Sequence, residues 1–531
     1  MSIGISLFLR PIFLVLESAV LYITAYDAPA YAYLLGFVAL VPFFFFLRNE
    51  HSVRRIFWYG FLFGIVTIAG SIVWFLSTYP LEWAGIENRF AAAVIVLAIW
   101  AATSALLGLF LAFFAVLVKK FARNDWGDFL LIPSLWVLME FLRALTLSLL
   151  FLGSQSSLGA DWTFGFFGHT LVWSSLLTLF APLGGVYLLS FIGVLINYAV
   201  FLVLYRMQKR GTLRMVLVVA GVLSVLYIAD QATNLLWAKE IPQDTTTVAI
   251  VTTNFPAAFI PGFLTIGTQA NTLKNLLNEA VRSSPDIIVL PEDSRALAYI
   301  GTTTVQSILD RASKEILLID SSPISLVPGT LERMVFYSSH SGIIGTSDKV
   351  LLMPYGEYLP HIAVTAANLF GFQGWLSAFD GSRGFQKGTA TPIIFQGHTF
   401  GVLFCSEIIP ESLYRELAGN GAELLFNVAA HADFQTGKQV LYNQTLSVAK
   451  MKAASNGRFF IQAGNDVPSF FMDAHGNILG ESTRGEDGVM VVQAGFSTAE
   501  TPYTRFGDWL LIVALLIVTG SLLRTLFLRK P

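Results

Sequence analysis

The 531-residue chain contains little charge and a single cysteine. Only 13% of its residues are charged, and 35 acidic residues nearly balance 33 basic ones; soluble domains carry about 25%. This balance gives no electrostatic reason to expect nucleic acid as a partner. One cysteine, Cys405, excludes an internal disulfide, and no P-loop or Rossmann glycine motif indicates a nucleotide cofactor. Apolar residues dominate instead and make up 55% of the chain.

Long apolar runs account for most of these residues. A helix needs about 20 apolar residues to cross a bilayer. The runs cover roughly 7–25, 31–48, 56–78, 91–118, 129–152, 183–205, 212–229 and 509–528. They predict a transmembrane bundle of about seven helices within residues 1–237, and one C-terminal transmembrane helix with a short tail within residues 506–531.

Basic residues between the runs predict the orientation in the membrane. The segments "RNEHSVRR", "KKFARND" and "RMQKRGTLR" follow the second, fourth and sixth runs, and the C-terminus reads "LRTLFLRKP". Short loops rich in Lys and Arg stay in the cytoplasm. We therefore expect both termini in the cytoplasm and residues 238–505 on the extracytoplasmic, periplasmic side of the cell inner membrane.

Residues 238–505 alternate between predicted strands and helices, which indicates an α/β domain. Three predicted strands end on reactive side chains: "IIVLPED" leads to Glu292, "SDKVLLMPYGEYLP" contains Lys349 and Glu357, and "GVLFCSE" contains Cys405. Catalytic groups of α/β folds often lie where strands end. A thiol attacks as the thiolate, a carboxylate can take its proton, and a lysine can stabilise an oxyanion. The alternative is that Cys405 is a small buried hydrophobic residue.

The order of Glu, Lys and Cys on these motifs resembles the nitrilase superfamily, whose domain is an αββα sandwich. With spans before and after that domain, the chain is similar to the apolipoprotein N-acyltransferase family, most closely in "PYGEYLP" and "CSE". The resemblance implies Glu292 as base, Lys349 as oxyanion partner and Cys405 as nucleophile. It implies Glu357 and Glu407 in support. It also implies a phospholipid acyl donor in the bilayer and a lipoprotein acceptor. We expect no cofactor.

Some segments differ from that family. Ser406 stands where the family has an aromatic residue, and "NVAAHADFQ", residues 427–435, replaces Ser-Asn-Asp-x-Trp-Phe. These differences leave the acceptor open, so a membrane-tethered amidase that uses water is an alternative. A receptor or transporter is an alternative of another class, because buried charges within spans mark transport sites. Glu140 and Arg143 in the fifth run are the main candidates for such charges.

His431 and Asp433 lie together in "HADF". They raise the alternatives of a metal site or of a Cys–His pair between His431 and Cys405. Two ligand types in one short stretch are weak grounds for a metal, and we expect none.

An aromatic stretch precedes Cys405. In "NLFGFQGWLSAF", residues 368–379, Phe370, Phe372 and Trp375 lie around two glycines. Small residues are common at hinges, and aromatic side chains favour the membrane interface. We expect a lipid-binding lid over Cys405, and the alternative is a packed core helix.

Overall fold

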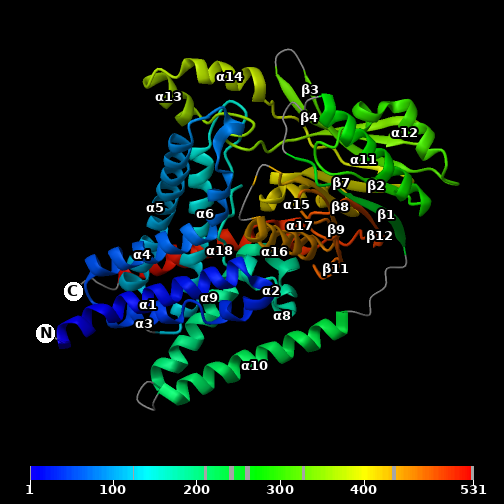
Figure 1. The fold of residues 1–531 in the computed structure, drawn as a ribbon. Helices are drawn as coiled ribbons and strands as arrows, with labels where there is room; N and C mark the ends of the chain where they lie inside the picture. The colour runs from blue at the N-terminus through cyan, green and yellow to red at the C-terminus, as the bar shows by residue number, and fades with distance from the viewer. Residues whose placement is uncertain are drawn as a thin grey trace.

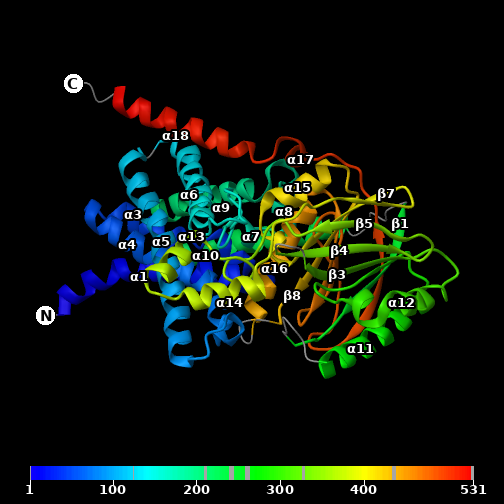
Figure 2. The ribbon, with the colours of Figure 1, turned by 90° about the horizontal axis from the view of Figure 1, so that it is seen from above.

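The protein consists of a helical bundle and an α/β domain that lie side by side (Figure 1). The computed structural model describes residues 2–123, 125–207, 212–237, 244–256, 263–325, 329–432, 434 and 438–527. The long helix α10 runs along the outside of the bundle before the chain enters the α/β domain. After that domain the chain returns to the bundle through α17 and α18, and α18 packs beside α6 (Figure 2).

Short helical segments interrupt the long helices of the bundle. In chain order its elements are α1 (Ser2–Asp27), α2 (Pro29–Ala32), η1 (Tyr33–Phe37), α3 (Val41–Asn49), α4 (Val53–Ser71), η2 (Val73–Thr78), η3 (Leu81–Ala84), α5 (Arg89–Phe121), α6 (Asp128–Leu150), α7 (Gly168–Leu171), α8 (Ser175–Thr178), α9 (Ala181–Met207), α10 (Thr212–Trp237), α17 (Pro502–Phe506) and α18 (Trp509–Phe527). The apolar run 31–48 is therefore divided among three segments, and Pro29 and Pro42 each lie in the first turn of one of them.

Six segments of the described chain are long and apolar enough to cross a membrane. They are Pro29–Asn49, Val53–Ser71, Arg89–Phe121, Asp128–Leu150, Ala181–Met207 and Val216–Thr233. The helix α18 contributes a shorter apolar segment, Trp509–Arg524, and α1 is not among the six. The expectation of several membrane helices is confirmed, whereas the count of seven before the α/β domain and one after it stays a prediction.

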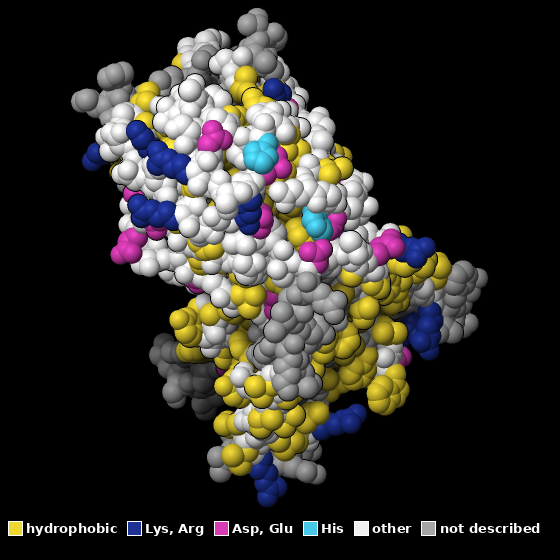
Figure 3. Space-filling view, turned by 90° about the vertical axis from the view of Figure 1, so that its right-hand side faces the viewer, with side chains coloured by type: hydrophobic (Ala, Val, Ile, Leu, Met, Phe, Trp, Pro, Cys, Tyr) yellow, Lys and Arg dark blue, Asp and Glu magenta, His cyan; other side chains and the backbone are white. Residues whose placement is uncertain are grey.

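The outer surface of the bundle is apolar. Figure 3 shows hydrophobic side chains over much of the lower half of one face, and charged side chains mainly over the upper half, where the α/β domain lies. Large exposed apolar side chains on the bundle helices include Phe13, Trp58, Leu97, Phe113, Leu217, Val225 and Ile228. An apolar surface of this extent is stable against lipid rather than water.

The α/β domain is built on two six-stranded sheets, ordered β12-β1-β2-β3-β4-β5 and β11-β10-β9-β8-β7-β6. The central neighbours β1, β2 and β3 are parallel in the first sheet, and β7, β8 and β9 in the second. The strands are β1 (Thr245–Thr252), β2 (Ile287–Val289), β3 (Leu317–Ser325), β4 (Thr330–Ser338), β5 (Gly342–Asp348), β6 (Ile393–Phe395), β7 (His398–Phe404), β8 (Leu424–Ala430), β9 (Phe459–Asn465), β10 (Phe470–Met472), β11 (Ile478–Glu481) and β12 (Gly488–Gly495).

Helices cover the outer face of each sheet. Along β1, Val248 and Ile250 join the core between the sheets, whereas Ala249 and Val251 join the core beneath the outer helices. This alternation follows from the two-residue period of a strand, and burial on both faces explains its continuous apolar sequence. The outer helices are α11 (Phe263–Arg282) and α12 (Thr302–Leu309) on the first sheet, and α15 (Glu411–Gly419) and α16 (Lys438–Asn456) on the second. The predicted αββα sandwich is confirmed.

The helix α16 also joins the sandwich to the bundle, because it packs against α9 as well as against the second sheet. Trp173 of the bundle donates its indole N–H to Ser447 Oγ at 2.7 Å. Gln444 donates from Nε2 to the backbone oxygen of Ser71 at 2.8 Å. Polar pairs of this kind fix the sandwich on the bundle in one orientation, since a buried polar group needs its partner.

Candidate active site

The predicted catalytic side chains follow three strands, as expected from the sequence. Glu292 lies three residues after β2, Lys349 comes directly after β5, and Cys405 comes directly after β7. The first two residues belong to one sheet and Cys405 to the other. The site therefore lies where the ends of the two sheets meet.

Lys349 pairs with two carboxylates. Its Nζ donates to Glu292 Oε1 at 3.0 Å and to Glu357 Oε1 at 2.6 Å, and the lysine side chain is 2% exposed. Burial lowers the pKa of Lys349, but the two glutamates outweigh burial and hold that pKa well above its usual value. The lysine is therefore a fixed positive charge, placed where it can stabilise a negative oxygen.

The backbone of Ala430 connects the acid to the thiol. Its N–H donates to Glu292 Oε2 at 3.2 Å, and its carbonyl oxygen lies 3.8 Å from Cys405 Sγ. Ala430 ends β8, which is the parallel neighbour of β7. Ala430 was considered in the sequence only as part of the segment 427–435, with no role in the site.

The thiol is protonated in the resting site. Burial raises the pKa of Cys405 far above its usual range, and the Glu292 carboxylate raises it further, against the opposing effect of Lys349. Burial also raises the pKa of Glu292, while Lys349 lowers it. A buried carboxyl with a raised pKa is a better proton acceptor for a thiol than an exposed one, so the pair suits general base catalysis.

Glu407 joins the Cys405 turn to the Lys349 segment. Its fully buried carboxylate accepts the backbone N–H of Phe404 at 2.7 Å and of Leu351 at 3.0 Å, and also that of Val350. Burial raises the pKa of Glu407 to about 7, and these three bonds oppose the rise. Ser406 adds a further link, because its Oγ donates to Leu351 O at 3.0 Å. The contacts fit the supporting role that the resemblance implies for Glu407.

A fourth glutamate, which was not predicted from the sequence, lies near the site. Glu332 lies in β4 and is 5% exposed, and its backbone oxygen accepts the N–H of Lys349 at 2.9 Å. Burial, followed by the charges of Asp293 and Glu292, raises the pKa of Glu332 well above its usual value. A charged residue inside the apolar strand "TLERMVFYSS" was the available signal.

Among the described residues, no contact supports the alternative that His431 pairs with Cys405. His431 is buried next to Ala430, and none of its contacts among the described residues joins it to Cys405. Burial, followed by the charges of Lys438 and Arg484, lowers the pKa of His431 to about 4. Such an imidazole is neutral at pH 7 and a weak base. Asp433 lies outside the described residues.

The aromatic stretch 368–379 lies on the surface and spans two helices, α13 (His361–Leu369) and α14 (Gln373–Arg383). Phe370 and Phe372 are 75% and 60% exposed, Trp375 is half-buried, and Phe379 is buried. The linking residue Gly371 has a φ of 78°, which suits glycine. Backbone hydrogen bonds attach the chain on both sides of these two helices. His361 N donates to Leu152 O at 2.8 Å, and Phe385 N donates to the backbone oxygen of the site residue Glu357 at 2.9 Å.

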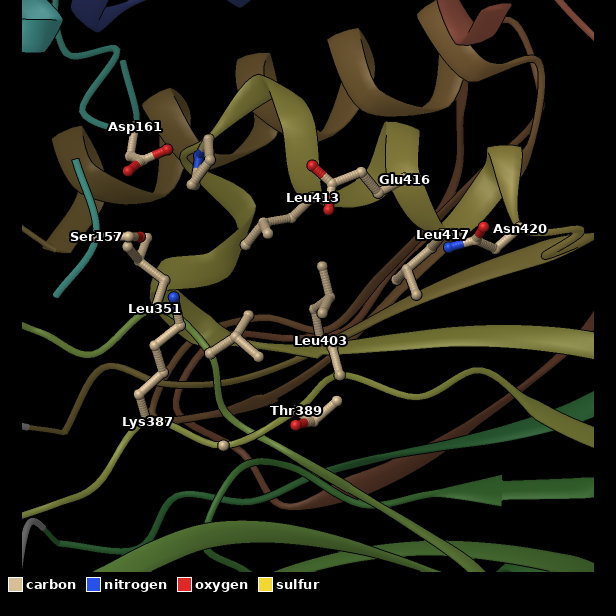
Figure 4. Close-up of a pocket in the computed structure, with 14 residues that line it drawn as sticks. Ser157, Asp161, Leu351, Lys387, Thr389, Leu403, Leu413, Glu416, Leu417 and Asn420 are labelled. Carbon is tan, nitrogen blue, oxygen red and sulfur yellow. The ribbon is translucent and has the colours of Figure 1, made fainter. Parts of the chain in front are cut away.

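A separate pocket of about 280 Å³ lies between α15 and the loop that joins α6 to α7, which contributes Ser157 and Asp161. Figure 4 shows Leu403, Leu413 and Leu417 converging at its centre, with Asp161 and Glu416 along one edge. The described residues that line it do not include Cys405, Glu292 or Lys349. The pocket is therefore distinct from the thiol site.

Comparison with known proteins places the chain in a family. Residues 223–501, more than half of the chain, match the carbon-nitrogen hydrolase family. The chain belongs to that family. Residues 18–199, in the bundle, match a second family of domains, the apolipoprotein N-acyltransferase N-terminal domain.

Similar proteins extend the match over nearly the whole chain. An apolipoprotein N-acyltransferase of Geobacter metallireducens is 24% identical over 514 residues, covering 92% of this chain and 91% of its own. The apolipoprotein N-acyltransferase of Nitrosomonas europaea is 27% identical over 521 residues, which cover 93% of this chain and 94% of its own. Among solved structures, the nitrilase-superfamily protein Nit3 of Saccharomyces cerevisiae covers 48% of this chain and 92% of its own, at 14% identity and a TM-score of 0.37. The resemblance predicted from the sequence is confirmed.

Proposed function

We propose that the protein moves an acyl chain from a phospholipid, through a thioester on Cys405, to the N-terminal amine of a diacylglyceryl-cysteine lipoprotein. The observation that supports this most is the Lys349 ammonium, held between Glu292 and Glu357 at the strand ends that also carry Cys405. The substrate class comes from the names of the similar proteins.

The first half of the reaction forms the thioester. Glu292 takes the proton of Cys405 Sγ, and the sulfur attacks the ester carbonyl carbon of the phospholipid. Lys349 stabilises the resulting oxyanion. The ester C–O bond then breaks, and Glu292 returns the proton to the departing lysophospholipid oxygen.

The second half transfers the acyl chain to an amine. The amine nitrogen attacks the thioester carbonyl carbon, and Glu292 takes a proton from the nitrogen. The C–S bond then breaks, the sulfur recovers a proton from Glu292, and an N-acyl amide leaves. Water must be kept away from the thioester, because water as the second nucleophile would make the protein a hydrolase of the amidase type.

Intact-protein mass spectrometry tests the covalent step. We expect wild-type protein from its native membrane to carry the mass of one acyl chain, and folded Cys405→Ala protein to carry none. Adding a diacylglyceryl-cysteinyl peptide should remove the adduct and yield N-acylated peptide. An unmodified wild-type protein would contradict the thioester, and release of free fatty acid in place of acylated peptide would indicate the hydrolase.

We also propose the membrane topology expected from the sequence. The 26-residue helix α1 would supply the seventh span before the α/β domain, and α18 would return the C-terminus to the cytoplasm. The basic ends of α5 and α9 support this orientation, with Lys119 and Lys120 in the last turn of α5 and Arg206 in that of α9. This arrangement places the α/β domain outside the cytoplasm.

The stretch 368–379 is proposed as the lipid-binding lid. Its exposed Phe370 and Phe372 favour a surface role over a core helix. Its attachment beside Glu357 supports placement at the entrance to the site. An acyl chain needs such an apolar path, since each CH₂ group left in water costs about 0.8 kcal/mol.

A further inference from the structure

The turn that carries Cys405 leads directly to the side of the sandwich that faces the bundle. Cys405–Ile408 form a 3₁₀ turn, and α15 begins at Glu411 after its N-cap residue Pro410. Glu411 therefore follows the nucleophile by only six residues. A displacement at the start of α15 is transmitted to Cys405 through this short segment.

Glu411 is buried between helices of both domains. Its Oε1 lies 3.1 Å from Nε2 of His169 in α7, and its Oε2 lies 2.9 Å from Nζ of Lys452 in α16. All three side chains are 5% exposed or less. Burial would raise the pKa of Glu411, but the charge of Lys452 and the hydrogen bond with His169 together outweigh burial and lower that pKa to about 2. The buried carboxylate is therefore charged and depends on both partners.

Two backbone carbonyls in the same segment accept hydrogen bonds from other parts of the chain. Thr163, in the bundle loop between α6 and α7, donates from Oγ1 to Ile409 O at 2.9 Å. Tyr503 of α17 donates its hydroxyl to Glu411 O at 3.0 Å. The segment that follows Cys405 is thus held by four elements, and three of them, α7, the loop between α6 and α7, and α17, belong to the membrane bundle.

We propose that His169 and Glu411 are positioning residues, through which the membrane bundle fixes the Cys405 turn relative to Glu292 and Lys349. The requirement arises because Cys405 belongs to the second sheet, whereas its base and its cation belong to the first. A displacement of about 1 Å can lower a rate by about 100-fold. The inference rests on the proposed role of Cys405 as the nucleophile.

The only cysteine makes the test direct, because iodoacetamide labelling of the full-length protein reports on Cys405 alone. A thiol with a correctly placed base reacts well below its own pKa, whereas a displaced thiol must ionise unaided. We expect His169→Ala to slow labelling at pH 7 by about 10- to 100-fold, and to make the rate climb steeply with pH. Glu411→Gln, which keeps one acceptor oxygen, should retain more labelling than Glu411→Ala.

Ser447→Ala is the matched control, because it removes the hydrogen bond from Trp173 across the same interface but away from the Cys405 segment. Its labelling rate should stay within about twofold of wild type, and circular dichroism verifies the fold of each variant. Wild-type labelling in folded His169→Ala, or an equal loss in Ser447→Ala, would overturn the proposal. Glu411→Gln replaces His169→Ala in this comparison if the latter does not fold. If wild-type protein resists labelling at every pH, the proposed role of Cys405 as nucleophile is itself wrong. That outcome differs from failure of the positioning proposal, in which wild-type protein is labelled normally.

Discussion

Replacing Lys349 with Met should destabilise the protein strongly, in addition to abolishing acyl transfer. The Lys349 Nζ lies 3.0 Å from Glu292 Oε1 and 2.6 Å from Glu357 Oε1, and it is the cation that both carboxylates share. Methionine fills a similar volume without charge. The variant therefore leaves two carboxylates, 11% and 16% exposed, facing each other without their common partner.

The magnitude follows from the burial of the group. Removing one member of a buried ion pair costs about 3–5 kcal/mol, because the remaining charge is uncompensated. The loss should depend on pH. Without Lys349, burial and the charge of Glu357 raise the pKa of Glu292 further above its value in the unfolded chain. The folded variant then holds more protons than the unfolded one, so its stability falls further as the pH rises above about 4.5.

Thermal unfolding of the purified protein in detergent measures the effect. Lys314→Met is the matched control, since Lys314 pairs with Asp286 at 2.6 Å but is 38% exposed, and exposed pairs contribute at most about 1 kcal/mol. Adding Glu357→Gln to Lys349→Met should recover part of the stability but no activity. The reasoning fails if Lys349→Met unfolds no earlier than Lys314→Met, or if the double variant is no more stable than the single one.

Four further outcomes are expected. Glu292→Gln should slow adduct formation by about 10²–10⁴-fold, measured by mass spectrometry of a timed reaction. Glu407→Gln should lower the free energy of unfolding by about 1.5–3 kcal/mol, because an amide nitrogen cannot accept a backbone N–H; an unchanged unfolding curve would contradict the three bonds. A periplasmic reporter should be active when fused after residue 240 and inactive at the C-terminus, and the reverse pattern would exclude lipoproteins as acceptors. Changing Phe372 and Trp375 to Ser should reduce turnover of membrane phospholipid far more than turnover of a short soluble ester, whereas equal losses would favour a core role.

The strand ends of the site could be predicted because each combines an apolar run with a reactive side chain. Glu292, Lys349 and Cys405 all follow strands in the structure. The role of Ala430 could not be predicted from its own identity, because it acts through backbone N–H and carbonyl groups that every residue has. Glu332 was missed for another reason, because a single acidic residue in a strand normally indicates an exposed face.

The attachment of the sandwich to the bundle could not be predicted from a pattern. The helix α16 covers Lys438–Asn456. It carries many polar residues, which on a surface helix would face water. Most of α16 is nevertheless buried, because the bundle supplies partners such as Trp173 for Ser447 and the Ser71 carbonyl for Gln444. These partners lie more than 250 residues away in the chain, so local periodicity does not reveal them.

The buried charges have the same arrangement at the active site and at the interface between the sandwich and the bundle. Lys349 lies between Glu292 and Glu357, and Glu411 lies between His169 and Lys452, so that one charge is shared by groups from different elements. Replacing such a cluster with apolar residues is often neutral or stabilising in other proteins, so stability alone does not account for it. A shared charge does fix the relative positions of its partners, because it holds each of them at a hydrogen-bonding distance. Apolar packing does not define such a distance. In a chain with only 13% charged residues, both clusters lie on the segments that set the position of Cys405.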